Sequence, residues 1–231
     1  MSKKFKVRDY AIIITVLFTI SLIINIFSYV NIRNYKYRIG KESQINIDSV
    51  RQRNESNMDI LNMSIDQGCI KNEELLKLYK NYEIIANNTI ELWEQYGEYK
   101  VNNFSRFSKE IETKKIIQND VHGRIKEYMF IVLTEAMKNR ESGLMLNEDY
   151  LNDFVVMQEL SGKIYHYFED FNSTKLLNFT GMDREKKIII NNYWIDMLQG
   201  IYDISDEYLN IQLSVSNIEN ANNIDIINEG K

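Results

Sequence analysis

The chain has 231 residues, of which 44% are hydrophobic and 26% are charged, and it carries a formal net charge of −5 at neutral pH. This much apolar sequence excludes a disordered polypeptide, and the length allows one large or two small domains with a buried core. Proline is absent, which favours long uninterrupted helices over turn-rich β architectures because proline breaks helices.

The charge is distributed unevenly along the chain. Residues 1–30 and residues 31–55 each carry a net charge of +3, which leaves about −11 on residues 56–231. Nucleic-acid binding needs a positive surface to meet the phosphates. The acidic body of the chain therefore argues against nucleic acid as a partner.

Residues 10–30 form the first predicted element, an apolar run without a charged side chain. Its length is that of a helix spanning the hydrocarbon core of a bilayer. The run is long for a signal peptide, and neither a small-residue cleavage site nor a lipoprotein cysteine follows it. We therefore predict a permanent single-span transmembrane helix, with the lipid bilayer as its partner.

The orientation of this helix is set by weaker signals. Basic residues flank it closely on both sides, so the positive-inside rule is nearly balanced. A tail as short as residues 1–9 before a lone anchor usually stays in the cytoplasm. We expect a single-pass protein of the cell membrane, with a cytoplasmic N-terminus and an extracytoplasmic body.

Residues 31–57 are polar and charged, with only a thin apolar line, and they predict a helical stalk that leaves the bilayer. A helical bundle is expected over residues 58–216, and a flexible tail over 217–231, where the composition turns to Asn, Asp and Glu. The first bundle helix should end near Gly68, because its apolar spacing stops there.

Helical spacing of apolar residues predicts four further helices. They begin at Asn72, cover 109–142, run over 148–171 after an Asn147 cap, and start again near Asp183. We expect Gly143 to stop the second of these in a left-handed cap conformation, and residues 172–181 to form a loop. No convincing alternating strand pattern occurs; the segment 188–191, Ile-Ile-Ile-Asn, is the best strand candidate.

The predicted fold class is all-α: an N-terminal single-span transmembrane helix continuing into an elongated antiparallel bundle of four to five long helices. Thirty-odd helical residues span about 50 Å. The turns near Cys69 and Gly143 should lie far from the membrane, and the loop at 172–182 close to it.

The two histidines, His122 and His166, are the candidate metal ligands. In an antiparallel hairpin of 109–142 and 148–171 they would stand at the same level. Carboxylates are nearby in sequence at Asp120, Glu169 and Asp170, and His with carboxylate is a common ligand set. The alternative is that each histidine only borders the apolar stripe of its helix.

The single cysteine, Cys69, excludes an intramolecular disulfide. It is either a small half-buried residue or a reactive thiol. Phosphate-binding loops and the common hydrolase, metalloprotease and redox motifs are absent from the sequence, so we expect neither an enzyme nor a cofactor. Fifteen tyrosines could edge the core or line a pocket for a small ligand.

Two functions fit this organisation. The first is a membrane-anchored helical interaction or scaffold protein of the cell envelope, with a protein partner or a second copy of itself. The second is an extracytoplasmic ligand-sensing module that signals through a partner. In outline, a membrane helix continuing into a bundle resembles the four-helix sensor modules of bacterial chemoreceptors and sensor kinases, although a second membrane span and an output domain are missing. A pocket in the bundle would favour sensing, and an exposed apolar patch a protein partner.

Overall fold

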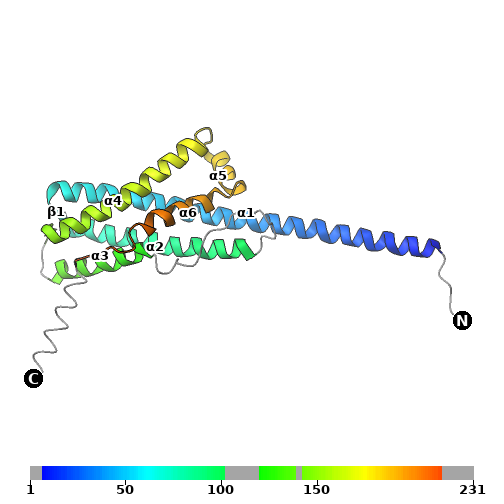
Figure 1. Ribbon diagram of the computed structural model, residues 1–231, viewed down its shortest axis with the longest axis horizontal. Coiled ribbons are helices and arrows are strands. Elements are labelled where there is room, and N and C mark those ends of the chain that lie inside the picture. Colours follow the sequence, from blue (N-terminus) through cyan, green and yellow to red (C-terminus); the bar gives the residue numbers. More distant parts are fainter. Residues whose placement is uncertain (1–6, 102–119, 139–141, 215–231) are drawn as a thin grey trace, which may run out of the picture.

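The computed structural model describes residues 7–101, 120–138 and 142–214, which are almost entirely helical (Figure 1). The predicted all-α class is confirmed. The elements are, in chain order, α1 (Val7–Gln67), β1 (Cys69–Lys71), α2 (Asn72–Val101), α3 (Val121–Lys138), β2 (Gly143–Met145), α4 (Glu148–Phe171), the π-helix η2 (Asn172–Leu176), α5 (Gly181–Ile190) and α6 (Tyr193–Asp206). The expected tail at 217–231 and the expected helical segment 109–119 lie outside the described residues.

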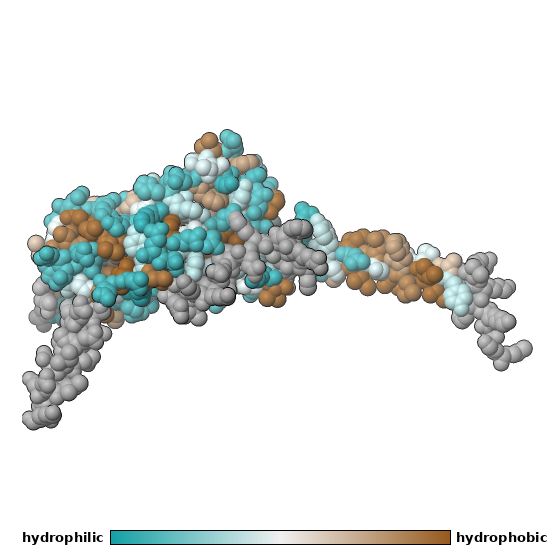
Figure 2. All heavy atoms as spheres, viewed as in Figure 1, coloured by the Kyte–Doolittle hydropathy of each residue, from teal (hydrophilic) through white to brown (hydrophobic). Residues whose placement is uncertain are grey.

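Helix α1 is an uninterrupted helix of 61 residues, about 90 Å long at 1.5 Å per residue. Its N-terminal part is long and apolar enough to cross a membrane, and its most apolar window is not buried by any other part of the protein. Figures 1 and 2 show this part as a bare, mostly hydrophobic rod that projects from the helical body. The rod and the centre of the body therefore belong to a single helix.

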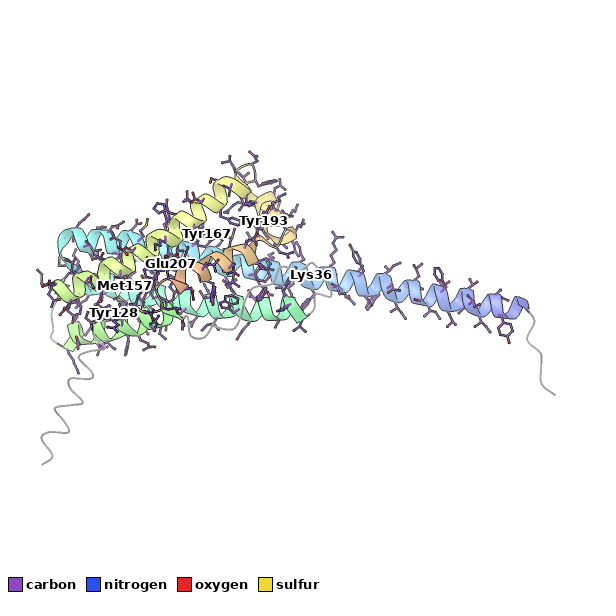
Figure 3. All side chains as sticks on the ribbon, in the orientation of Figure 1. Lys36, Tyr128, Met157, Tyr167, Tyr193 and Glu207 are labelled. Carbon is purple, nitrogen blue, oxygen red and sulfur yellow. The ribbon has the colours of Figure 1, made fainter. Side chains whose placement is uncertain are left out.

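The structure differs from the predicted stalk at 31–57 in its packing, although the segment is helical as expected. The body begins near Lys36, which lies where α1 leaves the other helices (Figure 3). The Tyr35 hydroxyl donates to Glu98 of α2 at 3.0 Å, and from Ile39 onwards one side of α1 is buried. The thin apolar line of this segment faces the neighbouring helices, so it belongs to the core.

Helix α1 packs against α2, α4, α5 and α6. Helix α2 returns along α1, and α3 packs on α2 while α4 packs on α1. Helix α6 contacts α1, α2 and α4, and α5 lies against α1 near the end of the body from which the rod projects (Figure 1). Along α2, helix α6 ends at about the level where α3 begins, so the two short helices follow one another at the same side of the bundle.

Two short strands, β1 and β2, pair in antiparallel fashion at the end of the body farthest from the rod (Figure 1). In their register Ile70 faces Leu144, and Cys69, a half-buried free thiol, faces Met145. Sequence patterns missed this pair because three residues are too few to show alternation. Helix α1 ends as predicted before Gly68, whose φ of 66° stops the helix.

Gly143 does not adopt the predicted left-handed helix cap. It lies in β2, and Gly68 and Gly181 are the glycines with positive φ in the described part of the chain. A Cβ atom on Gly143 would lie 2.6 Å from the carbonyl oxygen of Ile70. The glycine is therefore required by the close approach of the two strands.

The last predicted helix is divided into α5 and α6. Asn192, between them, has a φ of 54°, a left-handed conformation that cannot continue a right-handed helix. The strand candidate 188–191 is instead the end of α5, with Asn191 as the C-cap, and the first half of the expected loop at 172–181 forms η2. The Asn147 cap is confirmed, because its side chain accepts a hydrogen bond from the backbone N–H of Tyr150 at 3.1 Å.

Candidate ligand-binding cavity

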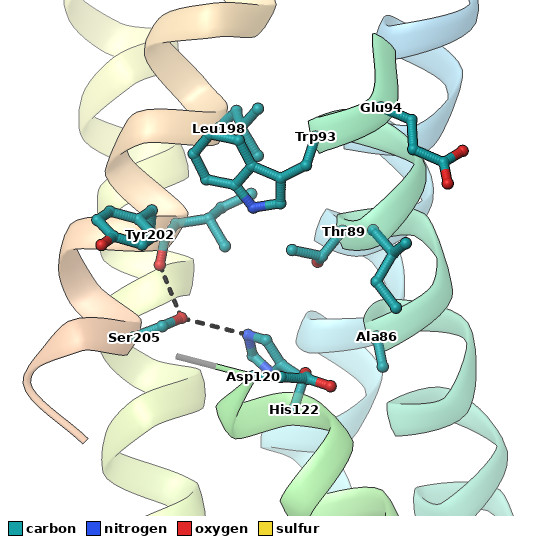
Figure 4. Close-up of a pocket in the computed structure, with 11 residues that line it drawn as sticks. Ala86, Thr89, Trp93, Glu94, Asp120, His122, Leu198, Tyr202 and Ser205 are labelled. Atoms are coloured by element: carbon teal, nitrogen blue, oxygen red, sulfur yellow. Dashed lines mark hydrogen bonds between the residues drawn. The ribbon is translucent and has the colours of Figure 1, made fainter. Parts of the chain in front are cut away.

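A cavity of about 430 Å³ lies between α2, α6 and the first turn of α3. This volume is within the range of small-molecule sites in proteins. Figure 4 shows side chains from all three helices around it. Most of the wall is apolar or aromatic, and the polar groups are few; the wall includes Ala86, Thr89, Trp93, His122, Leu198, Tyr202 and Ser205.

The arrangement of helices explains why a cavity forms at this place. Helices α6 and α3 follow one another along α2, and the end of one meets the beginning of the other at Ser205 and His122. Side chains do not fill the space between two such helix ends as completely as they fill the seam between parallel helix axes. On the facing side, α2 presents the small side chains of Ala86 and Thr89.

Two aromatic rings form one wall of the cavity. The indole of Trp93 and the ring of Tyr202 meet edge to face, with centroids 5.5 Å apart and an interplanar angle of 83°. Trp93 also contacts Tyr96 edge to face at 6.0 Å. Such pairs hold their rings in defined orientations, so the wall is preorganised between α2 and α6.

His122 forms the floor of the cavity and is 3% exposed. Its Nε2 lies 3.5 Å from the hydroxyl of Ser205, and its ring stacks on Tyr82, with centroids 6.4 Å apart. Burial lowers the pKa of His122 from 6.5 to about 4, and the nearby carboxylate of Asp120 opposes this shift only partly. The imidazole is therefore neutral at physiological pH, with one donor and one acceptor nitrogen.

The hydroxyl of Ser205 makes its closer hydrogen bond within α6. It donates its hydrogen to the carbonyl oxygen of Ile201 at 2.7 Å, whereas Nε2 of His122 is 3.5 Å away. Nδ1 is buried and has no hydrogen-bond partner among the described residues.

A buried polar layer continues from His122 into the centre of the bundle. The hydroxyl of Tyr82 lies 3.4 Å from that of Ser161 on α4, and the amide of Asn54 on α1 donates to the backbone carbonyl of Ser161 at 2.8 Å. Burial raises the pKa of Tyr82 to about 12. A chain of contacts thus joins the cavity to α1 through α2 and α4.

The structure gives the two histidines different surroundings. His122 is buried between α3, α2 and α6, whereas His166 is exposed on α4 beside the ring of Tyr165. Asp120 accepts a hydrogen bond from the backbone N–H of Gly123 at 2.8 Å and so caps α3. In the described part of the chain, no group of three His, Cys, Asp or Glu side chains lies close enough to hold a metal ion.

A second, more open cleft of about 420 Å³ lies between α1, η2 and α5. Its arginines already have partners within the chain. Arg51 lies within 4 Å of Asp48 and Glu55, and Arg184 donates to the side-chain oxygen of Asn172 at 2.7 Å. The cavity beside His122 is therefore the better candidate site.

Sequence reasoning identified His122 but not the site around it. From the sequence, Trp93, Leu198 and Tyr202 are only members of the apolar faces of predicted helices, and no pattern distinguishes Ser205. The available signals were the small residues Ala86 and Thr89 within an otherwise large apolar stripe. Small side chains in an apolar stripe indicate a cavity only when the residues of the facing helix are known.

The described residues form an almost entirely helical protein, in which one helix of membrane-spanning length enters a body with an internal cavity. No protein-family model, no curated protein and no solved structure matches this chain. The function is therefore argued from the fold and the cavity.

Proposed function

We propose that this protein is a membrane-anchored, non-catalytic helical module that senses a small ligand in the cavity beside His122 and signals through a partner protein. The observation that carries the proposal is the position of the cavity. It lies in a helical body whose central helix, α1, is continuous with the apolar rod.

The rod serves as the anchor in this proposal. Residues 10–30 cross the membrane once, the N-terminus is cytoplasmic, and the body lies outside as an elongated antiparallel bundle. Contacts between α1 and α2 begin at Tyr35, only a few residues beyond the apolar run, so the body lies close to the bilayer surface. Arg33, Lys36 and Arg38 stand at this boundary, where basic side chains can reach lipid headgroups.

The polar layer supplies a route from ligand to anchor. His122 lines the cavity and stacks on Tyr82, whose hydroxyl meets Ser161, and Ser161 accepts from Asn54 of α1. A ligand that displaces the imidazole changes the packing of Tyr82 and, through it, the hydrogen bonds that hold α1 against α4. Two sites are coupled when a ligand at one of them changes the contacts that are made at the other.

The second candidate function is that of an interaction or scaffold protein of the cell envelope, acting on a protein partner or as a homo-oligomer. Exposed apolar side chains on neighbouring helices favour it: Leu76 on α2, and Phe130 and Met137 on α3, are each exposed by 46% or more. In this alternative the partner binds whether or not the cavity is occupied.

In-cell cross-linking of the full-length protein separates the two functions. The variant Ala86→Phe fills the cavity, because Ala86 is buried in its wall. Asn87→Phe places the same ring at the next, exposed position of α2 and is the matched control. Sensing predicts that Ala86→Phe changes the yield of the cross-linked partner severalfold while Asn87→Phe does not. Equal yields from the wild type and both variants would support the scaffold function instead.

The membrane orientation needs its own measurement. A reporter that is active only outside the cytoplasm is fused to the C-terminus, and a second fusion carries a reporter active only in the cytoplasm. We expect activity from the first fusion alone. Activity from the second fusion alone would place the body in the cytoplasm and contradict the proposed orientation.

A further inference from the structure

We propose that helix α5 and the loop before it dock on anionic lipid headgroups of the bilayer that α1 spans, and so form a second contact between the body and the membrane. This inference goes beyond ligand sensing and rests only on the proposed anchor. The position of α5, its charge, its exposed apolar side chains and a basic cleft beside it carry the inference.

Helix α5 lies at the end of the body from which the rod projects (Figure 1). A Cβ atom on Gly40 of α1 would lie 3.0 Å from the side chain of Ile189, so the two helices touch at this level. Gly40 is ten residues beyond Val30, about 15 Å along the helix axis. The headgroup layer occupies the first part of this distance. Because membrane helices are commonly tilted by about 20°, a tilt of α1 towards α5 brings α5 to the headgroups.

The charge of this end of the body differs from that of the rest. Residues 31–41 carry a net charge of +4 and residues 172–193 carry +2, whereas residues 42–171 and 194–231 together carry −14. The end of α2 lies on another side of α1 (Figure 1), and its residues 91–101 carry −2. An anionic surface attracts basic segments, so it favours a tilt of the body towards α5 and away from α2.

Apolar side chains around α5 are exposed to an unusual degree. Leu177, Met182 and Ile190 are exposed by 74%, 75% and 71%. Met182, Lys186 and Ile190 are spaced by four residues and share one face of the helix. Helices that lie on a bilayer surface combine apolar side chains with lysines in this way. The exposed face of α5 therefore suits the boundary between headgroups and acyl chains.

An open cleft of about 500 Å³ lies between the loop at 178–180 and α5. Its lining combines two lysines and one acid with neutral polar groups: Asn178, Thr180, Asp183, Lys186, Lys187 and Asn191. Nζ of Lys187 lies 5.1 Å from the ring centroid of Phe179, a contact that holds the ammonium group at the cleft. Neither lysine forms an ion pair within the described part of the chain. Two ammonium groups beside exposed apolar side chains fit the phosphate of a lipid headgroup.

Fluorescence quenching in lipid nanodiscs tests the position of α5 in the full-length protein. A dye is attached at Met182→Cys, in a chain in which Cys69→Ser removes the native thiol, and the quencher is carried on lipid headgroups. Met145→Cys in β2 is the control, because Met145 is 72% exposed at the far end of the body. We expect quenching at position 182 to be severalfold stronger with phosphatidylglycerol in the nanodiscs than with phosphatidylcholine alone. Position 145 should stay unquenched in both, and this comparison leaves every lysine in place.

Neutral variants test the cleft itself. We expect Lys186→Gln with Lys187→Gln to lose most of the additional quenching, because each lysine near an anionic surface strengthens binding about fivefold. Lys71→Gln with Lys77→Gln removes the same charge from exposed positions near the far end of the body and should keep the quenching. Inorganic phosphate separates a headgroup from a free anion. It should lower the quenching no more than chloride does at equal ionic strength.

Several results would overturn the proposal. Equal quenching in the two lipids, or at positions 182 and 145, would contradict the docking of α5. Unchanged quenching in the variant with both cleft lysines replaced would exclude the cleft, and a loss caused by phosphate but not by chloride would make the cleft a site for a free anion. A wrong anchor would instead appear as absence of the protein from the nanodiscs. The cross-linking experiment does not depend on where α5 lies, so failure of this inference and failure of the proposed function are distinguishable.

Discussion

His122 takes a buried place on α3 in which its ring stacks on Tyr82 and its Nε2 meets Ser205. The surroundings are mostly apolar, and the one nearby charge, on Asp120, is too exposed to offset the loss of solvent. A neutral imidazole is therefore part of the folded structure. Its protonation would place a charge within the core beside the cavity.

Acidification should destabilise the fold through His122. The unfolded chain takes up this proton near pH 6.5 and the folded protein only near pH 4, so the unfolded state binds more protons between these values. The free energy of unfolding then falls as the pH falls through this window, by about 2 kcal/mol at pH 4.5. Denaturant titrations in detergent at pH 7 and about pH 4.5 measure it. We expect His122→Gln to lose this part of the pH dependence and His166→Gln to keep it; an unchanged slope in His122→Gln would contradict the assignment.

Asn54 is the residue through which the polar layer reaches α1. Its amide donates to the carbonyl of Ser161 at 2.8 Å and is 2% exposed. We expect Asn54→Ala to lower the free energy of unfolding by about 1–3 kcal/mol, because a buried carbonyl loses its donor. Asn152→Ala, at an exposed position of α4, is the control and should change stability by less than about 0.5 kcal/mol. Equal effects of the two substitutions would show that the layer does not stabilise the bundle.

At the scale of elements, the break between α5 and α6 determines where the cavity forms. Helix α5 lies on α1, and the turn at Asn191 and Asn192 redirects the chain so that α6 runs between α4 and α2. A single straight helix over 183–216 would not bring Tyr202 opposite Trp93. The cavity therefore depends on the left-handed conformation of Asn192, which redirects the chain between α5 and α6.

Substitutions at Asn192 should report on this turn. We expect Asn192→Ala to cost about 1 kcal/mol of folding free energy, because alanine is strained at a φ of 54°, and Asn192→Gly to be close to neutral. Asn191→Ala changes the neighbouring asparagine, whose φ is −89°, and serves as the matched control. Thermal unfolding followed by circular dichroism measures all three. A greater loss in Asn191→Ala than in Asn192→Ala would contradict this view of the turn.

At the scale of the whole molecule, α1 joins the apolar rod to the centre of the body without interruption. A continuous helix transmits rotation and displacement along its axis better than a flexible linker does. Its buried face begins at Ile39, and its exposed apolar face ends near Ile32. Only a few residues separate the proposed membrane segment from the first contacts of the body.

Charges in the middle of the rod should abolish membrane insertion. The double variant Ile20→Lys with Ile24→Lys places two charges at the helix centre, each of which costs about 2.5–3.5 kcal/mol of insertion free energy. We expect this variant to move from the membrane fraction to the soluble fraction after carbonate extraction. Asn31→Lys with Asn34→Lys adds the same charges outside the apolar run and should remain in the membrane. If both variants stayed in the membrane fraction, the rod would not be the anchor.

The sequence alone determined the features that depend on neighbouring residues. The length of the apolar run, the helical spacing along α2, α3 and α4, the end of α1 at Gly68 and the Asn147 cap are all decided within a few positions of the chain. The all-α class follows from these local patterns. They hold whichever helices become neighbours.

Only the tertiary structure decided the features that join distant parts of the chain. His122 and Ser205 are 83 residues apart in sequence, and the two strands pair across a similar span. Nothing local indicates that α6 and α3 follow one another along α2, or that residues 39–57 of α1 contribute to the core. Nor does it indicate that His122 is buried while His166 is exposed. The cavity depends on where helices end relative to one another, which is set by the packing of the complete bundle.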